Sequence, residues 1–178
     1  LNLNQKTEDV NTCILSTVNY KNIPSSRAVL LKFVNRNGFV FFTNYKSSKA
    51  KDIEYNKNVA LNFYWCQLER QVRISGIAKK IEDYESDKYF KERPRESQVG
   101  AWISEQSKVI DLDYKFEHNL KKVENKFKGK NIKRPLDWGG YCVSPNKMEF
   151  WQGRPYRLHD RVLYSLEDDI WKITNFFI

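Results

Sequence analysis

Cysteine and histidine, the residues that most often build metal sites and disulfide frameworks, are scarce in this chain. Its 178 residues include two histidines and three cysteines, and Cys13, Cys66 and Cys142 are widely spaced with no Cys-x-x-Cys pair. This pattern excludes a His-rich metal site and disfavours a zinc site or a disulfide framework. We therefore expect three small buried apolar side chains and a reducing, cytoplasmic setting.

Long apolar runs and nucleotide-loop motifs are absent too. The apolar runs are no longer than strands, the first residues are polar, and no repeat or low-complexity segment occurs. The sequence contains neither Gly-x-Gly-x-x-Gly nor Gly-x-x-x-x-Gly-Lys. These absences exclude a membrane-spanning helix, and they leave a signal peptide, a Rossmann cofactor site and a Walker nucleotide site without support.

Positive charge and aromatic side chains are abundant instead. The formal net charge is +9, the aromatic share is 15% and the hydrophobic share is 40%. This composition is typical of a globular chain, and the length suits a single domain over residues 1–178. The excess of Lys and Arg predicts an anionic partner, which leaves nucleic acid, an acidic membrane surface and phosphorylated small molecules open.

Short runs rich in Val, Ile, Phe and Tyr predict eight or nine strands, with turn signals at the intervals of an antiparallel barrel. The first five are residues 12–18, 27–34, 38–43, 59–65 and 70–82, and four more follow in "GGYCVSP", "KMEFWQG", "DRVLYSLE" and "WKITNFF". Helical patterns cover residues 47–56, 83–94, 96–107 and 112–127, with Asp83 as the N-cap of the second. The predicted fold class is mainly β, a β-barrel with peripheral α-helices.

The stretch "EFWQGRPYRLHDR", residues 149–161, concentrates cationic and aromatic side chains. If "RLHDR" is a strand, alternation places Arg157, His159 and Arg161 on one face, as a strip of donors suited to a phosphate or a polarised ring. The competing interpretation is a solvated strand face on which Asp160 pairs with one arginine. The pattern taken alone favours this second interpretation.

The stretch "KYFKERPRES" places another set of donors around a helix boundary. Tyr89 and Arg93 lie four residues apart on one helix face, Pro94 ends that helix, and Ser97 lies where the next helix starts. A phenol, a guanidinium, a hydroxyl and free helix N–H groups can converge on one phosphate. An N-cap serine beside a surface arginine explains the pattern equally well.

Weaker signals come from three other places. The turn that follows Thr43 is rich in Ser and Lys up to Lys49, and such a strand-to-helix turn can cradle a phosphate. Arg27 and Lys32 bracket four apolar residues on opposite faces of a strand, which is also the pattern of a buried strand with charged ends. Three polar side chains stand among apolar neighbours, where they bond to backbone or grip the edge of a heterocycle: Gln71, Gln106 and Ser107.

Together these segments resemble the pyridoxine/pyridoxamine 5′-phosphate oxidase family of FMN enzymes. The resemblance rests on "RAVLLK", "FFTNYKSSK", "FYWCQLERQVR", "SDKYFKERPRESQVGAWISEQS", "WGGYCVSP" and "EFWQGRPYRLHDR", which occur in the family's order. It implies an FMN-binding split β-barrel that forms a homodimer with active sites at the subunit interface. The implied partners are pyridoxine 5′-phosphate, pyridoxamine 5′-phosphate and O2, with no nucleic acid and no membrane.

The resemblance also implies a role for each matching residue. The implied FMN-binding residues are Arg27, Ala28, Val29, Leu30, Leu31, Lys32, Phe42, Thr43, Ser48, Lys49, Gln71, Gln106, Ser107, Trp151 and Arg161. The implied substrate-binding residues are Lys32, Tyr89, Arg93, Ser97, Arg157 and His159. Of these, Arg157 and His159 are also implied to be catalytic, because they match the residues over the substrate ring. The implied reaction transfers a hydride from the substrate to FMN, and O2 then reoxidises the flavin to give peroxide.

Three departures from the family pattern bear on these expectations. Ser48 occupies a position that is usually arginine, so we expect one contact fewer to the FMN phosphate. The family's N-terminal helical lid segment is expected to be missing, and "ITNFFI" stands where the family has a short Arg-Leu-x-Pro-like tail. Two alternatives therefore stay open: an FMN- or pyridoxal phosphate-binding protein of this fold with little turnover, and a nucleic-acid-binding module suited to the charge of +9.

Overall fold

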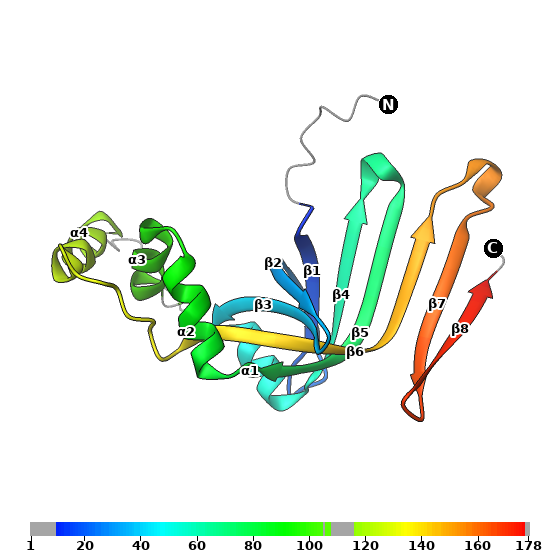
Figure 1. Ribbon diagram of the computed structural model, residues 1–178, viewed down its shortest axis with the longest axis horizontal. Helices are drawn as coiled ribbons and strands as arrows, with labels where there is room; N and C mark the ends of the chain where they lie inside the picture. The colour runs from blue at the N-terminus through cyan, green and yellow to red at the C-terminus, as the bar shows by residue number, and fades with distance from the viewer. Residues whose placement is uncertain (1–9, 105, 108–115, 177–178) are drawn as a thin grey trace.

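The described residues form one antiparallel sheet of eight strands (Figure 1). A computed structural model describes residues 10–104, 106–107 and 116–176. The strands are β1 (Thr12–Val18), β2 (Pro24–Asn35), β3 (Gly38–Asn44), β4 (Asn58–Trp65), β5 (Arg70–Lys80), β6 (Trp138–Gln152), β7 (Asp160–Glu167) and β8 (Ile170–Phe176). Their order is β3-β2-β1-β4-β5-β6-β7-β8, and pairing of β3 with β6 closes β1 to β6 into a barrel. The predicted mainly β split barrel is confirmed.

Alternating side chains fill the barrel interior. In β1, Cys13 and Leu15 point inward and are almost fully buried. They pack with Phe41 of β3 and Leu61 of β4 in the main hydrophobic cluster. Burial in this apolar surrounding raises the pKa of the Cys13 thiol to about 12, so the thiol behaves as a small apolar group.

The expectation of three buried cysteines was wrong for Cys66, which is exposed, while Cys142 is half-buried. Cys66 opens the short 3-10 turn η1 (Cys66–Leu68) that joins β4 to β5, so it lies outside the barrel.

None of the helices in the described part of the chain combines the length and apolar character that crossing a membrane requires.

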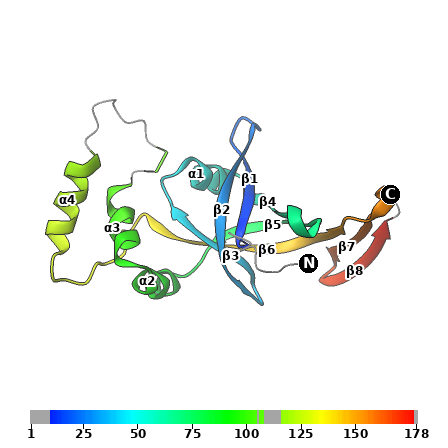
Figure 2. The same ribbon diagram turned by 90° about the horizontal axis from the view of Figure 1, so that it is seen from above.

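Two of the predicted strands, "GGYCVSP" and "KMEFWQG", are one long strand, β6, which continues through Pro145. Opposite this proline, the register of β5 shifts between Ser75 and Gly76. Such a bulge accommodates a residue that has no N–H for the ladder. A Cβ on Gly76 would lie 2.3 Å from the carbonyl oxygen of Ser144, so the approach requires glycine. β6 thus closes the barrel with its first half and carries the β7–β8 hairpin with its second (Figure 2).

The helices pack outside the barrel. They are α1 (Ser48–Tyr55), α2 (Asp83–Glu92), α3 (Arg95–Ile103) and α4 (Phe116–Phe127). α2, α3 and α4 gather at one end of the molecule (Figures 1 and 2), where Phe90, Val99 and Trp138 belong to a second buried cluster. Two predicted boundaries were wrong, because Glu82 and not Asp83 is the N-cap of α2, and α3 ends at Ile103. The predicted start of the last helix at residue 112 lies outside the described residues.

Candidate active site

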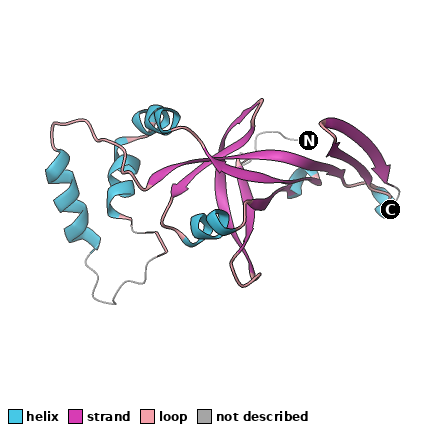
Figure 3. Cartoon of the chain, turned by 90° about the horizontal axis from the view of Figure 1, so that it is seen from below, coloured by secondary structure: helices cyan, strands magenta, loops and turns pink. Residues whose placement is uncertain are grey.

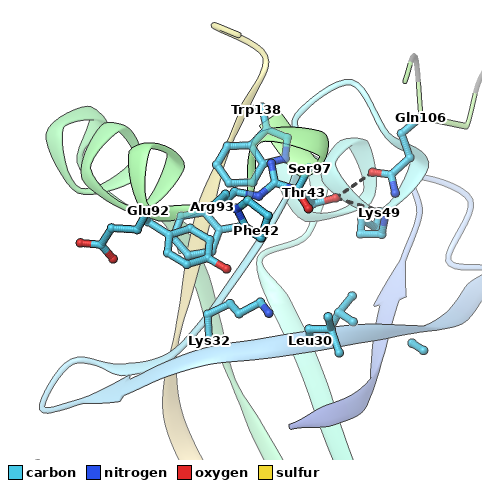
Figure 4. A pocket seen from close by; sticks show the side chains of 14 residues that line it. Leu30, Lys32, Phe42, Thr43, Lys49, Glu92, Arg93, Ser97, Gln106 and Trp138 are labelled. Carbon is cyan, nitrogen blue, oxygen red and sulfur yellow. Dashed lines mark hydrogen bonds between the residues drawn. The ribbon is translucent and has the colours of Figure 1, made fainter. Parts of the chain in front are cut away.

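A cavity of about 520 Å³ lies beside β2, β3 and the helices α2 and α3 (Figure 4). It is lined by Ala28, Val29, Leu30, Lys32, Phe42, Thr43, Lys49, Tyr89, Glu92, Arg93, Pro94, Ser97, Gln106 and Trp138. The cavity therefore brings together predicted site residues from the first strands, from the α2–α3 boundary and from the segment after α3.

The strand β2 presents its two faces differently. Ala28, Leu30 and Lys32 point outward and line the cavity, whereas Arg27 lies on the more buried face. The predicted placement of Arg27 and Lys32 on opposite faces is confirmed. Arg27 Nη1 donates to Thr17 Oγ1 at 2.6 Å, and Nη2 lies 3.6 Å from Asp52 Oδ2. Burial lowers the pKa of Arg27, and the Asp52 carboxylate partly offsets that effect.

The turn from β3 into α1 gathers the residues predicted to cradle a phosphate. The buried Lys49 donates from Nζ to Thr43 Oγ1 at 3.2 Å, and Thr43 donates to Gln106 Oε1 at 3.0 Å (Figure 4). The backbone N–H of Ser48 donates to Ser107 Oγ at 3.2 Å. Residues distant in the sequence thus meet at the N-terminus of α1.

Lys49 carries a buried charge without an ion pair among the described residues. Burial lowers its pKa, and repulsion from Arg27 lowers it further. Next to it, Ser47 is the N-cap of α1, and its buried Oγ has no hydrogen-bond partner within the described segments. A buried cation in the first turn of a helix, whose N–H groups carry partial positive charge, forms a site that an anion would complete.

Arg93, the C-cap of α2, lies in the cavity wall between aromatic rings. Its guanidinium carbon is 4.5 Å from the centre of the Trp138 ring and 5.7 Å from that of Phe90. Burial lowers the pKa of Arg93, with a smaller opposing effect of Tyr89. The buried Nη1 has no hydrogen-bond partner in the described part of the chain, and Figure 4 shows the Glu92 carboxylate directed away from it. A buried N–H without a partner is costly, so the site favours an incoming acceptor.

Other predicted residues lie around the far end of β6. Gln71 of β5 pairs with Trp151 of β6, which pairs with Arg161 of β7. The His159 ring centre is 4.8 Å from that of Trp151, and its Nδ1 accepts the backbone N–H of Arg154 at 3.1 Å. We call the predicted residues at this end the distal cluster: Gln71, Trp151, Arg157, His159 and Arg161.

The strand over "RLHDR" on which a shared face depended is absent, whereas the predicted strand "DRVLYSLE" is confirmed as β7 (Asp160–Glu167). The first three residues of "RLHDR" precede β7, and the first of them, Arg157, is the last residue of the 3-10 turn η2 (Pro155–Arg157). Tyr156 and Arg157 have φ of 59° and 63°, in the left-handed region that no strand residue adopts. Arg157 and His159 therefore do not share a strand face with Arg161. Asp160 does pair with one arginine, Arg154, at 2.7 Å.

The cavity and the distal cluster lie at opposite ends of the sheet. No member of the distal cluster lines the cavity. Figures 1 and 3 show the 3-10 turns beside the distal cluster far from α2 and α3, which flank the cavity. One copy of the chain therefore holds the predicted residues in two separate groups.

Three residues that contact the predicted site residues were not identified from the sequence: Trp138, Asp52 and Glu149. Trp138 stacks on Phe42 with ring centres 5.2 Å apart. The sequence signal that could have identified Trp138 is its position before the Gly-Gly pair of "WGGYCVSP". Asp52 and Glu149 bind Arg27 and Arg161, respectively. The sequence offers no signal for these two pairs, because each joins residues of different elements.

The chain matches known proteins over nearly its whole length. Residues 2–126 match the family described as Pyridoxamine 5′-phosphate oxidase, and residues 138–177 match the Pyridoxine 5′-phosphate oxidase C-terminal dimerisation region. A pyridoxine/pyridoxamine 5′-phosphate oxidase 2 of Hydrogenovibrio crunogenus is 52% identical over 169 residues, which cover 94% of this chain and 79% of that protein. A pyridoxine/pyridoxamine 5′-phosphate oxidase of Leptospira biflexa is 53% identical over 161 residues, or 90% and 76% of the two chains.

A solved structure shares the architecture closely. PhzG from Burkholderia lata 383, in complex with tetrahydrophenazine-1-carboxylic acid, superposes with a TM-score of 0.90 at 25% identity. The superposition covers 96% of this chain and 83% of PhzG. From its family match, its relatives and its barrel, the chain belongs to the pyridoxine/pyridoxamine 5′-phosphate oxidase family of oxidoreductases.

Proposed function

We propose that the protein is an FMN-dependent oxidase that converts pyridoxine 5′-phosphate or pyridoxamine 5′-phosphate to pyridoxal 5′-phosphate. O2 is the electron acceptor, and hydrogen peroxide is formed. The observation that carries the proposal is the presence of two cations, Lys49 and Arg93, in one cavity without carboxylate partners among the described residues. A phosphorylated cofactor and a phosphorylated substrate would supply the two missing anions, and the names of the relatives support this assignment.

The residues around Lys49 fit the phosphate end of FMN. Lys49, which lines the cavity, supplies the charge, and the first turn of α1 adds backbone N–H groups from which a phosphate accepts hydrogen bonds. Thr43 and Gln106 add a hydroxyl and an amide beside this point. The remaining residues that we assign to FMN are Arg27, Ala28, Val29, Leu30, Leu31, Lys32, Phe42, Ser48, Ser107, Gln71, Trp151 and Arg161. The chemistry that FMN supplies when bound is two-electron oxidation of the substrate carbon and reduction of O2.

The substrate phosphate is assigned to the other end of the cavity. Arg93, held over Trp138, donates there together with Tyr89, Ser97 and Lys32. Ser97 is the third residue of α3, so its backbone N–H lies in the unpaired first turn of that helix. These groups hold the substrate by its phosphate. The substrate carbon that is oxidised then contacts the rest of the site.

Arg157 and His159 are assigned to the substrate ring, where they orient it and stabilise developing charge. They lie in the distal cluster, within the match to the dimerisation region. We therefore propose that two copies of the chain combine, so that the distal cluster of one faces the cavity of the other. The electron-poor pyridine ring of the substrate reduces the need for a strong base. With pyridoxamine 5′-phosphate, hydrolysis of the imine product releases ammonia and leaves the aldehyde.

Likeness to PhzG favours one further candidate, a related oxidase acting on another ring acid. PhzG is solved with a carboxylic acid, whereas the cavity here presents two uncompensated cations in addition to Lys32. Oxidation of a phosphate-free tricyclic acid in preference to pyridoxine 5′-phosphate would favour this candidate.

An anaerobic titration tests the proposed function. The protein is saturated with FMN, pyridoxine 5′-phosphate is added, and the visible absorbance of the oxidised flavin is followed. Bleaching that reverses on admission of air establishes the oxidase. A bound flavin that stays yellow indicates a binding protein with little turnover. Failure to bind FMN, with salt-sensitive binding of oligonucleotides instead, would restore the nucleic-acid alternative.

We expect Arg157→Ala to impair reduction of FMN by the substrate more than it impairs FMN binding. Arg157 is exposed in η2, so its loss leaves the barrel intact. Stopped-flow measurement of the anaerobic reduction rate, beside a fluorescence titration with FMN, separates the two effects. An unchanged reduction rate would contradict the assignment of Arg157 to the substrate ring.

We expect Ser48→Arg to tighten FMN binding by about 1 kcal/mol, roughly fivefold in Kd, through one charge-assisted contact to the phosphate. Ser48 is the first residue of α1, beside Lys49. Ser48→Ala is the matched control and should bind as the native chain does, because Ser48 donates through its backbone N–H, which alanine retains. An unchanged Kd for Ser48→Arg would show that the serine causes no deficit.

A further inference from the structure

Glu149 of β6 is a buried acid in the midst of the distal cluster. Its carboxylate Oε1 accepts from Arg161 Nε at 2.8 Å, and Oε2 accepts from Arg73 Nη2. The side chain of Glu149 is 10% exposed, whereas those of Arg161 and Arg73 are 30% and 53% exposed. A carboxylate taken out of water in this way is retained only where cations satisfy it.

The register of the sheet explains why these three side chains meet. Gln71, Trp151 and Arg161 form one row across β5, β6 and β7. The next row on the same face, two residues along each strand, contains Arg73 opposite Glu149. Glu149 thus lies directly across from Arg73 and diagonally from Arg161, within reach of both.

The Arg161 guanidinium is held on two sides. Glu149 accepts from Nε, and the ring of Phe176 lies 5.1 Å from the guanidinium carbon. Within the described segments, its two terminal nitrogens make no hydrogen bond, so they remain free to donate to a ligand. Burial alone would raise the pKa of Glu149, but the hydrogen bonds from Arg161 and Arg73 outweigh it and hold that pKa below its usual value.

We infer that Glu149 is a positioning residue that orients Arg161, so that its terminal N–H groups face the bound flavin. This inference rests on the proposed function for the identity of the ligand. Glu149 does not touch the ligand itself. It removes the rotational freedom of a long side chain before binding, and a preorganised donor binds more tightly than a mobile one.

A double-mutant cycle tests the inference. Glu149→Gln should raise the Kd for FMN about tenfold in the native background and less than about twofold in an Arg161→Met background, because the effect passes through Arg161. Glu167→Gln is the matched control, since its ion pair with Lys172 on β7 and β8 is exposed, and it should leave the Kd unchanged. An equal loss in both backgrounds, or no loss in the native one, would overturn the inference.

A spectroscopic readout keeps this test separate from the proposed function. In the FMN-free protein, the Nε–H resonance of Arg161 should be protected from exchange with water, and Glu149→Gln should abolish the protection while the thermal midpoint shows a folded chain. A native protein that binds no FMN would refute the proposed function, yet this resonance would still show whether Glu149 holds Arg161. An Nε–H that exchanges freely in the native protein would refute the positioning role alone.

Discussion

Arg93→Met is expected to raise the KM for pyridoxine 5′-phosphate about a hundredfold, which corresponds to ~2–3 kcal/mol of lost phosphate binding. The reason is that Arg93 enters the cavity with a buried, unpartnered Nη1 and forms no ion pair within the described part of the chain, the Glu92 carboxylate being directed away from it (Figure 4). Its guanidinium is already oriented over Trp138, so little is lost in ordering it when the phosphate binds. Steady-state kinetics of peroxide formation measure the effect.

Two further variants make the Arg93 result specific. Arg93→Lys should recover only part of the affinity, because an ammonium keeps the charge but not the planar stacked donor. Arg95→Met removes a neighbouring arginine that donates to the carbonyls of Phe127 and Lys130 and does not line the cavity. It should lower the thermal midpoint with little change in KM. A KM that is unchanged in Arg93→Met would remove the phosphate site from this end of the cavity.

Lys49→Met is expected to weaken FMN binding tenfold or more and, at the same time, to stabilise the FMN-free protein. The first effect follows from loss of the cation assigned to the FMN phosphate. The second follows because burial and Arg27 both disfavour the charge of Lys49 in the folded chain. Relief of a penalty of about 1 kcal/mol would raise the thermal midpoint by roughly 2–4 °C in a chain of this size. Fluorescence titration and thermal unfolding measure the two effects.

The buried charge of Lys49 also predicts how the stability of the FMN-free protein changes with pH. The pKa of Lys49 is lower in the folded protein than in the unfolded chain, so between the two values the unfolded chain binds more protons. Stability of the FMN-free protein should therefore rise with pH through that alkaline window, and Lys49→Met should remove this rise. Lys51→Met, an exposed position on α1, is the control and should keep the slope. A destabilised Lys49→Met protein would show that Lys49 is a structural residue.

Local patterns in the sequence predicted most of the strands, because barrel strands alternate and are rich in β-branched and aromatic residues. The prediction divided β6 at Pro145, since proline ordinarily ends a central strand. The fold instead places a register shift of β5 opposite it. The strand over "RLHDR" that would have given Arg157, His159 and Arg161 a common face is absent for a related reason. After Pro155, two left-handed residues form a turn, and alternation has no meaning for side chains in a turn.

The sequence alone was sufficient for the family and for the mainly β class, because these depend on residue types in a fixed order. The sequence did not show which arginines and lysines are paired with a carboxylate and which are not. Pairing between strands and helices distant in sequence decides their roles: Asp52 and Glu149 neutralise and hold Arg27 and Arg161. Lys49 and Arg93 are left as uncompensated charges in one cavity. Only the tertiary structure makes that division, because the cost of a buried charge depends on which groups surround it in space.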